Sequence, residues 1–138
     1  KAMFQIKSNY MLMIDNLMDL THLGYVHNKT IGGNPNHHVA ADMETKQTDN
    51  GAYFIRWMMD HQPPPTYQKG GQFTGKVDRW QEFEYVGPSI VLQWSGALAV
   101  GKGARENREQ EGFHLRILHG ATPETETTFH YFYYPIKE

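Results

Sequence analysis

Strand-like segments separated by turn signals make up most of the sequence after residue 37, and this pattern limits the fold more than any other feature. Asn50-Gly51 separates two such segments, and this dipeptide is a strong signal for a tight hairpin turn. Aromatic and β-branched residues dominate the segments nearest the C-terminus, which favours strands there. The expected strands are His38 to Lys46, Ala52 to Met59, Ser89 to Val100, Phe113 to His119 and Thr127 to Tyr134, with Glu82 to Val86 as a further short strand.

One helical segment precedes these strands. Ser8 is placed to cap a helix that begins at Asn9, and apolar residues then recur at mostly helical spacing as far as Leu23. Gly24 is expected to end or distort this helix. A leading helix followed by about five antiparallel strands predicts an α+β domain, in which a curved sheet holds the helix against its concave face.

The connecting segments have clear turn and loop signals. Glycine and proline mark a loop from Thr30 to Asn36, and Pro63-Pro64-Pro65 is expected to open a long loop that reaches Val77. Lys102 to Glu111 mixes both signs of charge and predicts a solvated, mobile loop. Thr122-Pro123-Glu124 predicts the turn between the last two strands.

Composition excludes several classes of protein. The 138 residues fit one domain, and a net charge of -2 gives no electrostatic footprint for nucleic acid or an anionic membrane. No apolar run approaches the roughly 20 residues that span a bilayer. No signal-peptide pattern is present. The cytoplasm is taken as the default location. The chain has no cysteine but eight histidines, so a metal would be held by imidazole and carboxylate rather than thiolate.

The segment that ends at His27 carries the most informative chemistry. His22 and His27 are five residues apart, which is about 140° on an ideal helix. Their imidazoles can converge on one ion only if the helix widens or ends between them, and Gly24 lies in that gap. Two histidines and a carboxylate form the ligand set of non-haem Fe(II) oxygenases. Spacing alone leaves a purely structural histidine pair as the simpler interpretation.

Two neighbours of these histidines are candidates for supporting roles. Asp19 precedes His22 by three residues, so the two share a helix face, and its carboxylate is placed to accept the second N–H of that imidazole. Asn16 lies one turn before Asp19 and is expected near that carboxylate or the metal.

Two motifs together resemble a known family. The run from Asn16 to His22, closed by His27, resembles the iron-binding helix of Rieske non-haem iron ring-hydroxylating oxygenases, most closely the vanillate O-demethylase and dicamba monooxygenase type. The stretch His119-Gly120-Ala121-Thr122-Pro123-Glu124-Thr125-Glu126 is similar to the H-x-x-T-P-E-T-E stretch of the same group. The segment from Asn28 to about Arg79 resembles the family only loosely.

The resemblance implies a role for each matching residue. His22 and His27 are then ligands of a mononuclear Fe(II), and Asn16 is an amide close to the metal. Asp19 matches the carboxylate that links the iron site to the Rieske centre of a neighbouring subunit. His119 matches a substrate contact, and Gln93 falls near a second one. Without the resemblance, His119 would be expected to bond the turn backbone near Thr122.

The implied fold is the helix-grip (START-like) fold, which agrees with the α+β pattern. The family's third iron ligand is an aspartate on a later helix, and its Rieske domain uses cysteine, so residues 1–138 are expected to be a fragment of the catalytic domain. The expected fragment lacks the Rieske domain and the C-terminal helices, binds iron weakly and is inactive alone. None of the aspartates that follow the histidine pair stands in the context of the missing ligand: Asp42, Asp49, Asp60 and Asp78.

The implied activity is hydroxylation or O-demethylation of an aromatic substrate with O2, as mono- or dioxygenases of aromatic catabolism perform it. Electrons would pass from NAD(P)H through a reductase or ferredoxin and a Rieske [2Fe-2S] centre, in a homotrimer. Two alternatives stay open: a non-enzymatic helix-grip carrier of an apolar ligand, and an interaction domain that only completes a trimer. Five aromatic residues are candidates for either pocket wall or core: Phe54, Trp57, Trp94, Phe113 and Phe132.

The surroundings of the five remaining histidines are predicted from their neighbours in the sequence. His37 and His38 are predicted in an exposed loop that enters a strand, and His61, before three prolines, is predicted to be solvated. His114 and His130 lie in alternating strands, where each faces either the pocket or solvent.

Overall fold

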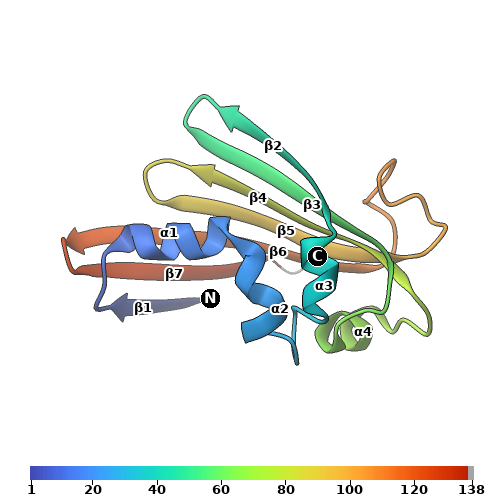
Figure 1. Cartoon of the computed structure of the whole chain (residues 1–138). Coiled ribbons are helices and arrows are strands. Elements are labelled where there is room, and N and C mark those ends of the chain that lie inside the picture. Colours follow the sequence, from blue (N-terminus) through green and yellow to red (C-terminus); the bar gives the residue numbers. More distant parts are fainter. Residues whose placement is uncertain (137–138) are drawn as a thin grey trace.

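A single antiparallel sheet with its helices on one face forms the protein (Figure 1). The computed structural model describes residues 1–136. Its strands are β1 (Ala2–Ile6), β2 (Asp42–Thr48), β3 (Gly51–His61), β4 (Val77–Val86), β5 (Ile90–Ala99), β6 (Phe113–Thr125) and β7 (Thr128–Ile136). The strand order β1-β7-β6-β5-β4-β3-β2 places the first strand beside the last, so β1 closes one edge of the sheet. The predicted α+β helix-grip fold is confirmed.

Short helices cover the concave face and one end of the sheet (Figure 1). They are α1 (Tyr10–Met18), the 3-10 helix η1 (Leu20–His22), α2 (Leu23–Val26), α3 (Pro35–Val39) and α4 (Pro65–Gly71). Helix α1 contacts β4 and β6, whereas α2 packs against α3 and α4 against β5 and β6. Within the described part of the chain, no helix is long and apolar enough to cross a membrane.

The leading helix differs from the prediction at both ends. Asn9 rather than Ser8 caps α1, because its Oδ1 accepts a hydrogen bond of 2.9 Å from the backbone N–H of Met11. The helix stops at Met18, since Asp19 adopts an extended conformation with φ −118° and ψ 102°. The chain then restarts as η1 and α2. Helix α1 therefore ends before His22, not at Gly24 as predicted.

Three other boundaries were predicted wrongly. His38 belongs to α3, which Asn34 caps and Pro35 begins, so the next strand starts only at Asp42. The proline run does not open a structureless loop, because Pro65 occupies the first turn of α4, where a missing N–H costs nothing. The expected turn at Thr122 to Glu124 lies within β6.

The strands also extend further than the sequence pattern indicates. Strand β4 begins at Val77 rather than Glu82, and its first five residues are all buried, which removes the polar–apolar alternation. Strand β1 was not predicted. It pairs with β7 from Ala2 opposite Tyr133 to Ile6 opposite Phe129.

The hydrophobic core has two main parts, one on each face of the sheet. On the concave face, Ile14, Leu20 and Leu23 from the helical segment pack on strand residues that include Phe54, Phe83 and Phe129. The opposite face buries Trp57 and Trp80 together with Ile55, Leu98 and Ala104.

The charged segment between β5 and β6 lies over this second face. It buries Ala104 at 1% exposure. Its Arg108 forms an ion pair with Glu82 and lies 4.3 Å from the ring centroid of Trp94. The segment is irregular, as predicted, but it covers tryptophan side chains instead of being a purely solvated loop.

Candidate metal and substrate site

A cavity of about 350 Å³ lies between the helical segment and the concave face of the sheet. Five of the six predicted site residues line it: Asn16, His22, His27, Gln93 and His119. The other wall residues are Leu17, Leu20, Leu23, Ile31, Tyr67, Gln81, Phe83, Ser95, Leu115, Ile117, Tyr131 and Tyr133. Asp19, the sixth predicted residue, is exposed and does not line the cavity.

The two histidines lie on the helical wall of this cavity. Their ring centroids are 5.7 Å apart and the ring planes meet at 69°. His22 ends η1 and His27 follows the last residue of α2 with φ −114° and ψ 24°. The chain therefore departs from helical geometry at His27, and this departure brings together two imidazoles that a straight helix would separate.

Gly24 has a packing role. It lies inside α2, and a Cβ atom there would be 2.5 Å from the Cα of Pro35. Only glycine permits this close approach of α2 to α3. The prediction that Gly24 ends or distorts the leading helix was therefore wrong, because that helix ends at Met18 and Gly24 lies inside α2.

The backbone of Asp19 orients the imidazole of His22. The Nδ1 of His22 lies 2.8 Å from the backbone carbonyl oxygen of Asp19. A carbonyl oxygen only accepts, so Nδ1 carries the proton and Nε2 keeps its lone pair. This is the tautomer that a metal ligand requires.

The carboxylate of Asp19 does not accept the N–H of His22, so that prediction was wrong. Its Oδ1 instead accepts a hydrogen bond of 2.9 Å from the backbone N–H of Thr21 and caps η1. This backbone hydrogen bond is the main cause that lowers the pKa of Asp19, and His22 and Arg56 contribute smaller effects of the same sign.

On the opposite wall of the cavity, the sheet contributes a row of buried polar side chains that are joined by hydrogen bonds. His119 is 5% exposed, with Nδ1 2.7 Å from the Tyr131 hydroxyl and Nε2 2.9 Å from Gln93 Oε1. Gln93 in turn donates from Nε2 to Ser95 Oγ at 2.9 Å. The alternative in which His119 bonds the turn backbone near Thr122 is not what the structure shows.

The direction of these hydrogen bonds follows from the atoms involved. Because Gln93 Oε1 can only accept, His119 donates from Nε2, and its Nδ1 accepts from the hydroxyl of Tyr131. Burial lowers the pKa of His119 to about 4 and raises the pKa of Tyr131 to about 12. Both groups are therefore neutral near pH 7, and both nitrogens of His119 are engaged.

The donor set fits part of a mononuclear iron site. Two half-buried imidazoles line one cavity, and at least one has a free Nε2. Across residues 1–136, no group of three or more histidine, cysteine, aspartate or glutamate side chains is arranged to hold a metal. The described chain therefore offers two ligands of the type that Fe(II) accepts, without a carboxylate to accompany them.

Of the two roles left open for the five aromatic candidates, the structure supports core over pocket wall, because Phe54 and Trp57 belong to core clusters and Trp94 and Phe113 pack against such clusters. Phe54, Trp57, Trp94, Phe113 and Phe132 do not line the cavity, and Trp57 lies in the core of the opposite face. Leucine, isoleucine and tyrosine side chains form most of the wall instead. On each strand, consecutive wall residues are two positions apart, because successive side chains alternate between the faces of the sheet. Residues two positions apart on a strand share a face. Stepping two positions from Gln93 to Ser95, or from His119 to Ile117, would therefore have identified these further wall residues from the sequence.

The remaining histidines lie outside the cavity. His37 stacks on His61 with ring centroids 3.7 Å apart, so His61 is not simply solvated. His38 is 2% exposed, not in an exposed loop, and its Nε2 donates to the backbone oxygen of Gly32 at 2.9 Å. His114 Nε2 donates to the backbone oxygen of Gln110, and His130 lies 3.5 Å from Glu124.

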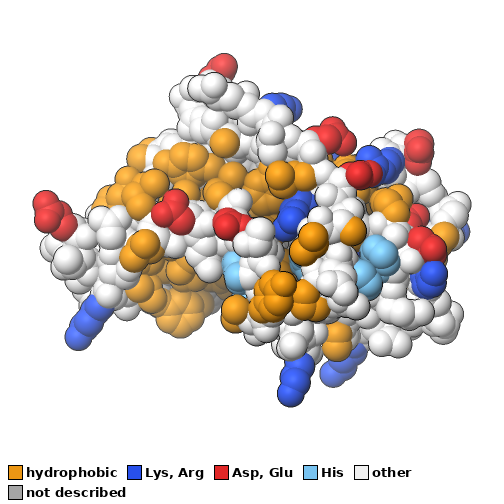
Figure 2. Space-filling model, in the orientation of Figure 1, with side chains coloured by type: hydrophobic (Ala, Val, Ile, Leu, Met, Phe, Trp, Pro, Cys, Tyr) orange, Lys and Arg blue, Asp and Glu red, His pale blue; other side chains and the backbone are white. Residues whose placement is uncertain are grey.

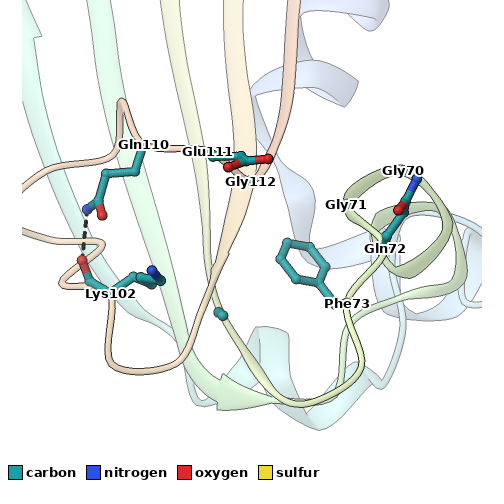
Figure 3. Close-up of a pocket in the computed structure, with 9 residues that line it drawn as sticks. Gly70, Gly71, Gln72, Phe73, Lys102, Gln110, Glu111 and Gly112 are labelled. Atoms are coloured by element: carbon teal, nitrogen blue, oxygen red, sulfur yellow. Dashed lines mark hydrogen bonds between the residues drawn. The ribbon is translucent and has the colours of Figure 1, made fainter.

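A second hollow of the molecule shares no lining residue with this site. Figure 2 shows histidine side chains at the surface beside α2 and beside α3, and hydrophobic side chains over α2 and on the sheet between α1 and β3. A separate hollow of about 440 Å³ lies between the end of α4 and the segment before β6 (Figure 3). Within it, Gln110 Nε2 donates to the backbone oxygen of Lys102 at 2.8 Å. None of the predicted site residues lines this hollow.

The fold is that of the catalytic domain of Rieske oxygenases. Residues 6–138 match the family described as the vanillate O-demethylase oxygenase C-terminal domain, and the chain belongs to this family.

Its curated relatives are oxygenase components. The iron-sulfur subunit of a toluene-4-sulfonate monooxygenase system from Comamonas testosteroni is 35% identical over 92% of this chain. The vanillate O-demethylase oxygenase subunit from a Pseudomonas species is 32% identical over 96% of this chain. The chain spans 37% and 38% of the lengths of these two relatives.

Solved structures of dicamba monooxygenase share the fold. The complex with 3,6-dichlorosalicylic acid is 27% identical and superposes with a TM-score of 0.85 over 97% of this chain and 38% of the other. A structure of that enzyme with non-haem iron and dicamba is 24% identical, with a TM-score of 0.72 over 97% of this chain and 35% of the other, and shows the same fold.

Proposed function

We propose that this chain provides the catalytic domain of an oxygenase that hydroxylates or O-demethylates an aromatic substrate. The observation that supports this most directly is the placement of His22 and His27. Their imidazoles are 5.7 Å apart and line the same cavity as Gln93 and His119. Mononuclear Fe(II) held by the two imidazoles would supply the activation of O2.

The cavity would bind and orient one substituted aromatic ring. Its volume of about 350 Å³ exceeds the roughly 150 Å³ of an apolar cavity that binds benzene, so it has room for a ring with substituents. Leu17, Leu115 and Ile117 would exclude water from the ring.

Gln93 would contact a polar substituent directly, because its amide has a second N–H beyond the one given to Ser95. His119 would orient Gln93, since both of its ring nitrogens are already engaged.

Partners of the reaction follow from the resemblance. Electrons would come from NAD(P)H through a reductase or ferredoxin and a Rieske [2Fe-2S] centre, with Asp19 as the link to that centre in a neighbouring subunit of a homotrimer. The exposure of Asp19 supports this role, because a group that meets another subunit must lie at the surface. The relatives named above act in systems for toluene-4-sulfonate and vanillate, which are both aromatic.

Iron binding tests this proposal. The complete protein would be loaded with Fe(II) without oxygen, beside His22→Ala and His27→Ala, with His130→Ala as a matched control on the other face of the sheet. Each site variant should lose the mononuclear iron and keep any Rieske signal, whereas the control should keep both. If both site variants retain full iron, the proposal is wrong, and iron-independent binding of apolar ligands would then identify a carrier.

The 138-residue chain by itself should bind Fe(II) weakly and not turn over. The reason is that its described residues offer two imidazoles and no third metal-ligating side chain beside them. Metal analysis of the purified chain after dialysis measures this, and tight stoichiometric iron would contradict it.

A further inference from the structure

The two histidines of the site are held in different ways. A hydrogen bond between Nδ1 of His22 and the backbone oxygen of Asp19 fixes the first imidazole directly. The imidazole of His27 contacts the ring of His22, and neither of its nitrogens forms a hydrogen bond within residues 1–136. Histidine ligands of metals are usually oriented by a partner on the second ring nitrogen. The direction of the His27 imidazole therefore depends on whatever holds its backbone.

The segment after His27 folds back onto its carbonyl group. The backbone oxygen of His27 accepts hydrogen bonds from the backbone N–H groups of Thr30 at 3.0 Å and Gly32 at 2.9 Å. Gly32 lies so close to α2 that a Cβ atom there would be 2.0 Å from the backbone oxygen of Leu23. The position of Gly32 therefore restrains the peptide plane that follows His27.

Arg79 of β4 holds this segment from the sheet. Its Nη2 donates to the backbone oxygen of Ile31 at 3.1 Å, and its Nη1 donates to that of Gly32 at 3.4 Å. Nε2 of His38 donates to the same Gly32 oxygen at 2.9 Å. The guanidinium group suits this task, because its rigid fork of donors can reach two consecutive carbonyl groups at once. One side chain of the sheet is thus joined to the backbone of His27 through Gly32.

The burial of Arg79 indicates that these hydrogen bonds have a purpose beyond packing. Its side chain is 0% exposed, its guanidinium carbon lies 4.6 Å from the ring centroid of Tyr67, and no carboxylate within residues 1–136 pairs with it. Burying a cation without an anion is unfavourable, and an apolar side chain of similar volume is often at least as stabilising. Core packing alone therefore does not account for an arginine at this position.

We propose that Arg79 is a positioning residue for His27. It holds the peptide groups of Ile31 and Gly32, and through Gly32 it keeps the His27 imidazole at the cavity beside His22. This inference rests on the proposed function, because it takes His27 as a ligand of Fe(II). It adds to the site a strand residue that is distant from the histidine pair in the sequence.

Amide hydrogen exchange of the iron-free complete protein tests the hold on His27. Arg79→Met removes the donors and keeps a long side chain. The amides of Thr30 and Gly32 should exchange about tenfold faster in this variant, because local opening no longer breaks two hydrogen bonds from a charged group. The amide of Asp19, which donates within α1 to Asp15, should exchange at an unchanged rate. Mass spectrometry of the exchanged protein measures both.

Iron affinity tests the consequence for the site. Fe(II) binding by the complete protein would be measured without oxygen against a competing chelator. Arg79→Met should bind Fe(II) about tenfold more weakly, as removal of a group that orients a metal ligand typically does. Arg79→Lys should lie between this variant and the unaltered protein, because an ammonium group is a point donor that can hold one carbonyl group but not the pair.

Leu98→Ala is the matched control for stability. Leu98 is 0% exposed in the core of the opposite face, so its truncation destabilises the fold without touching residues 30–32. Urea unfolding measures the loss of stability in each variant. Leu98→Ala should keep the iron affinity and the exchange rate at Gly32 of the unaltered protein. If Arg79→Met does not fold, Arg79→Lys carries both tests, with smaller changes of the same sign.

Two outcomes would overturn the positioning role. One is an unchanged exchange rate at Gly32 in the folded Arg79 variants. The other is an equal loss of iron affinity in Arg79→Met and Leu98→Ala, which would make Arg79 a purely structural residue. Absence of mononuclear iron from the unaltered protein would instead overturn the proposed function, because the hold of Arg79 on Gly32 is measured without iron.

Discussion

The imidazole of His22 is held by the backbone of Asp19, with Nδ1 2.8 Å from the carbonyl oxygen, while the Asp19 carboxylate caps the helix that follows. One residue therefore performs two separate tasks. Its backbone sets the tautomer of His22, and its side chain remains at the surface. This division means that a change of the Asp19 side chain should leave the orientation of His22 intact.

Asp19→Asn should therefore separate electron transfer from iron binding. Asparagine caps a helix about as well as aspartate, and the backbone carbonyl is unchanged, so fold and iron content should be retained. Turnover of the complete protein should fall if the carboxylate links the iron site to a Rieske centre. Iron analysis, oligomeric state and steady-state turnover measure the three properties. A variant with altered assembly and normal electron transfer would support a purely structural role instead.

Gly24→Ala should destabilise the protein. The added methyl group would lie 2.5 Å from the Cα of Pro35, a backbone atom that cannot move alone. Overpacking of this kind costs about 1–3 kcal/mol in the free energy of unfolding. Gly75→Ala is the control, because a Cβ there meets nothing within 4 Å. Urea unfolding of both variants gives the comparison, and equal stability would contradict the packing role.

Tyr131→Phe should lower the free energy of unfolding by about 1–3 kcal/mol, because Nδ1 of buried His119 loses the one donor that residues 1–136 provide and remains unpaired. Tyr25→Phe, at a side chain that is 69% exposed, should be close to neutral. Chemical unfolding measures both free energies. An unchanged stability in Tyr131→Phe would show that the hydrogen bond from Tyr131 is replaced without cost.

Stability should fall as pH decreases from about 6.5 towards 4, in part because of His119. Its pKa is lowered from 6.5 to about 4 in the folded state, so between these values the unfolded chain binds more protons than the folded chain. The full effect is about 3 kcal/mol and is absent above pH 7, where both states are neutral at this residue. Burial lowers the pKa of His38 as well, so it adds a loss of the same sign.

The variant His119→Gln isolates this contribution. Unfolding free energies measured from pH 4 to 7 should depend less on pH in His119→Gln than in the unaltered protein. The variant Gln47→Met, at an exposed position of β2 without a titratable group, should retain the original slope. Identical slopes in His119→Gln and the unaltered protein would show that His119 is not a buried neutral histidine.

Local sequence patterns were sufficient to predict the class of fold and most residues of the candidate site. Alternating segments and the Asn50-Gly51 turn predicted an antiparallel sheet, because pleat and turn chemistry depend on adjacent residues. The motif residues Asn16, His22 and His27 lie close together in the chain, and all three line one cavity. Helix α4 was missed because proline ends one element and begins another equally well.

Sequence by itself determined the α+β class, the histidine pair and the family, all of which depend on residue identity and short-range spacing. Only the tertiary structure decided that Gln93 bonds His119, that Gln81 lies beside Ser95, and that the carboxylate of Asp19 caps a helix instead of holding His22. The physical reason is that strand register and the break after α1 are set by packing between segments far apart in the chain. A shift of one residue in strand register would move the side chains of Gln81, Gln93, Ser95 and His119 to the other face of the sheet.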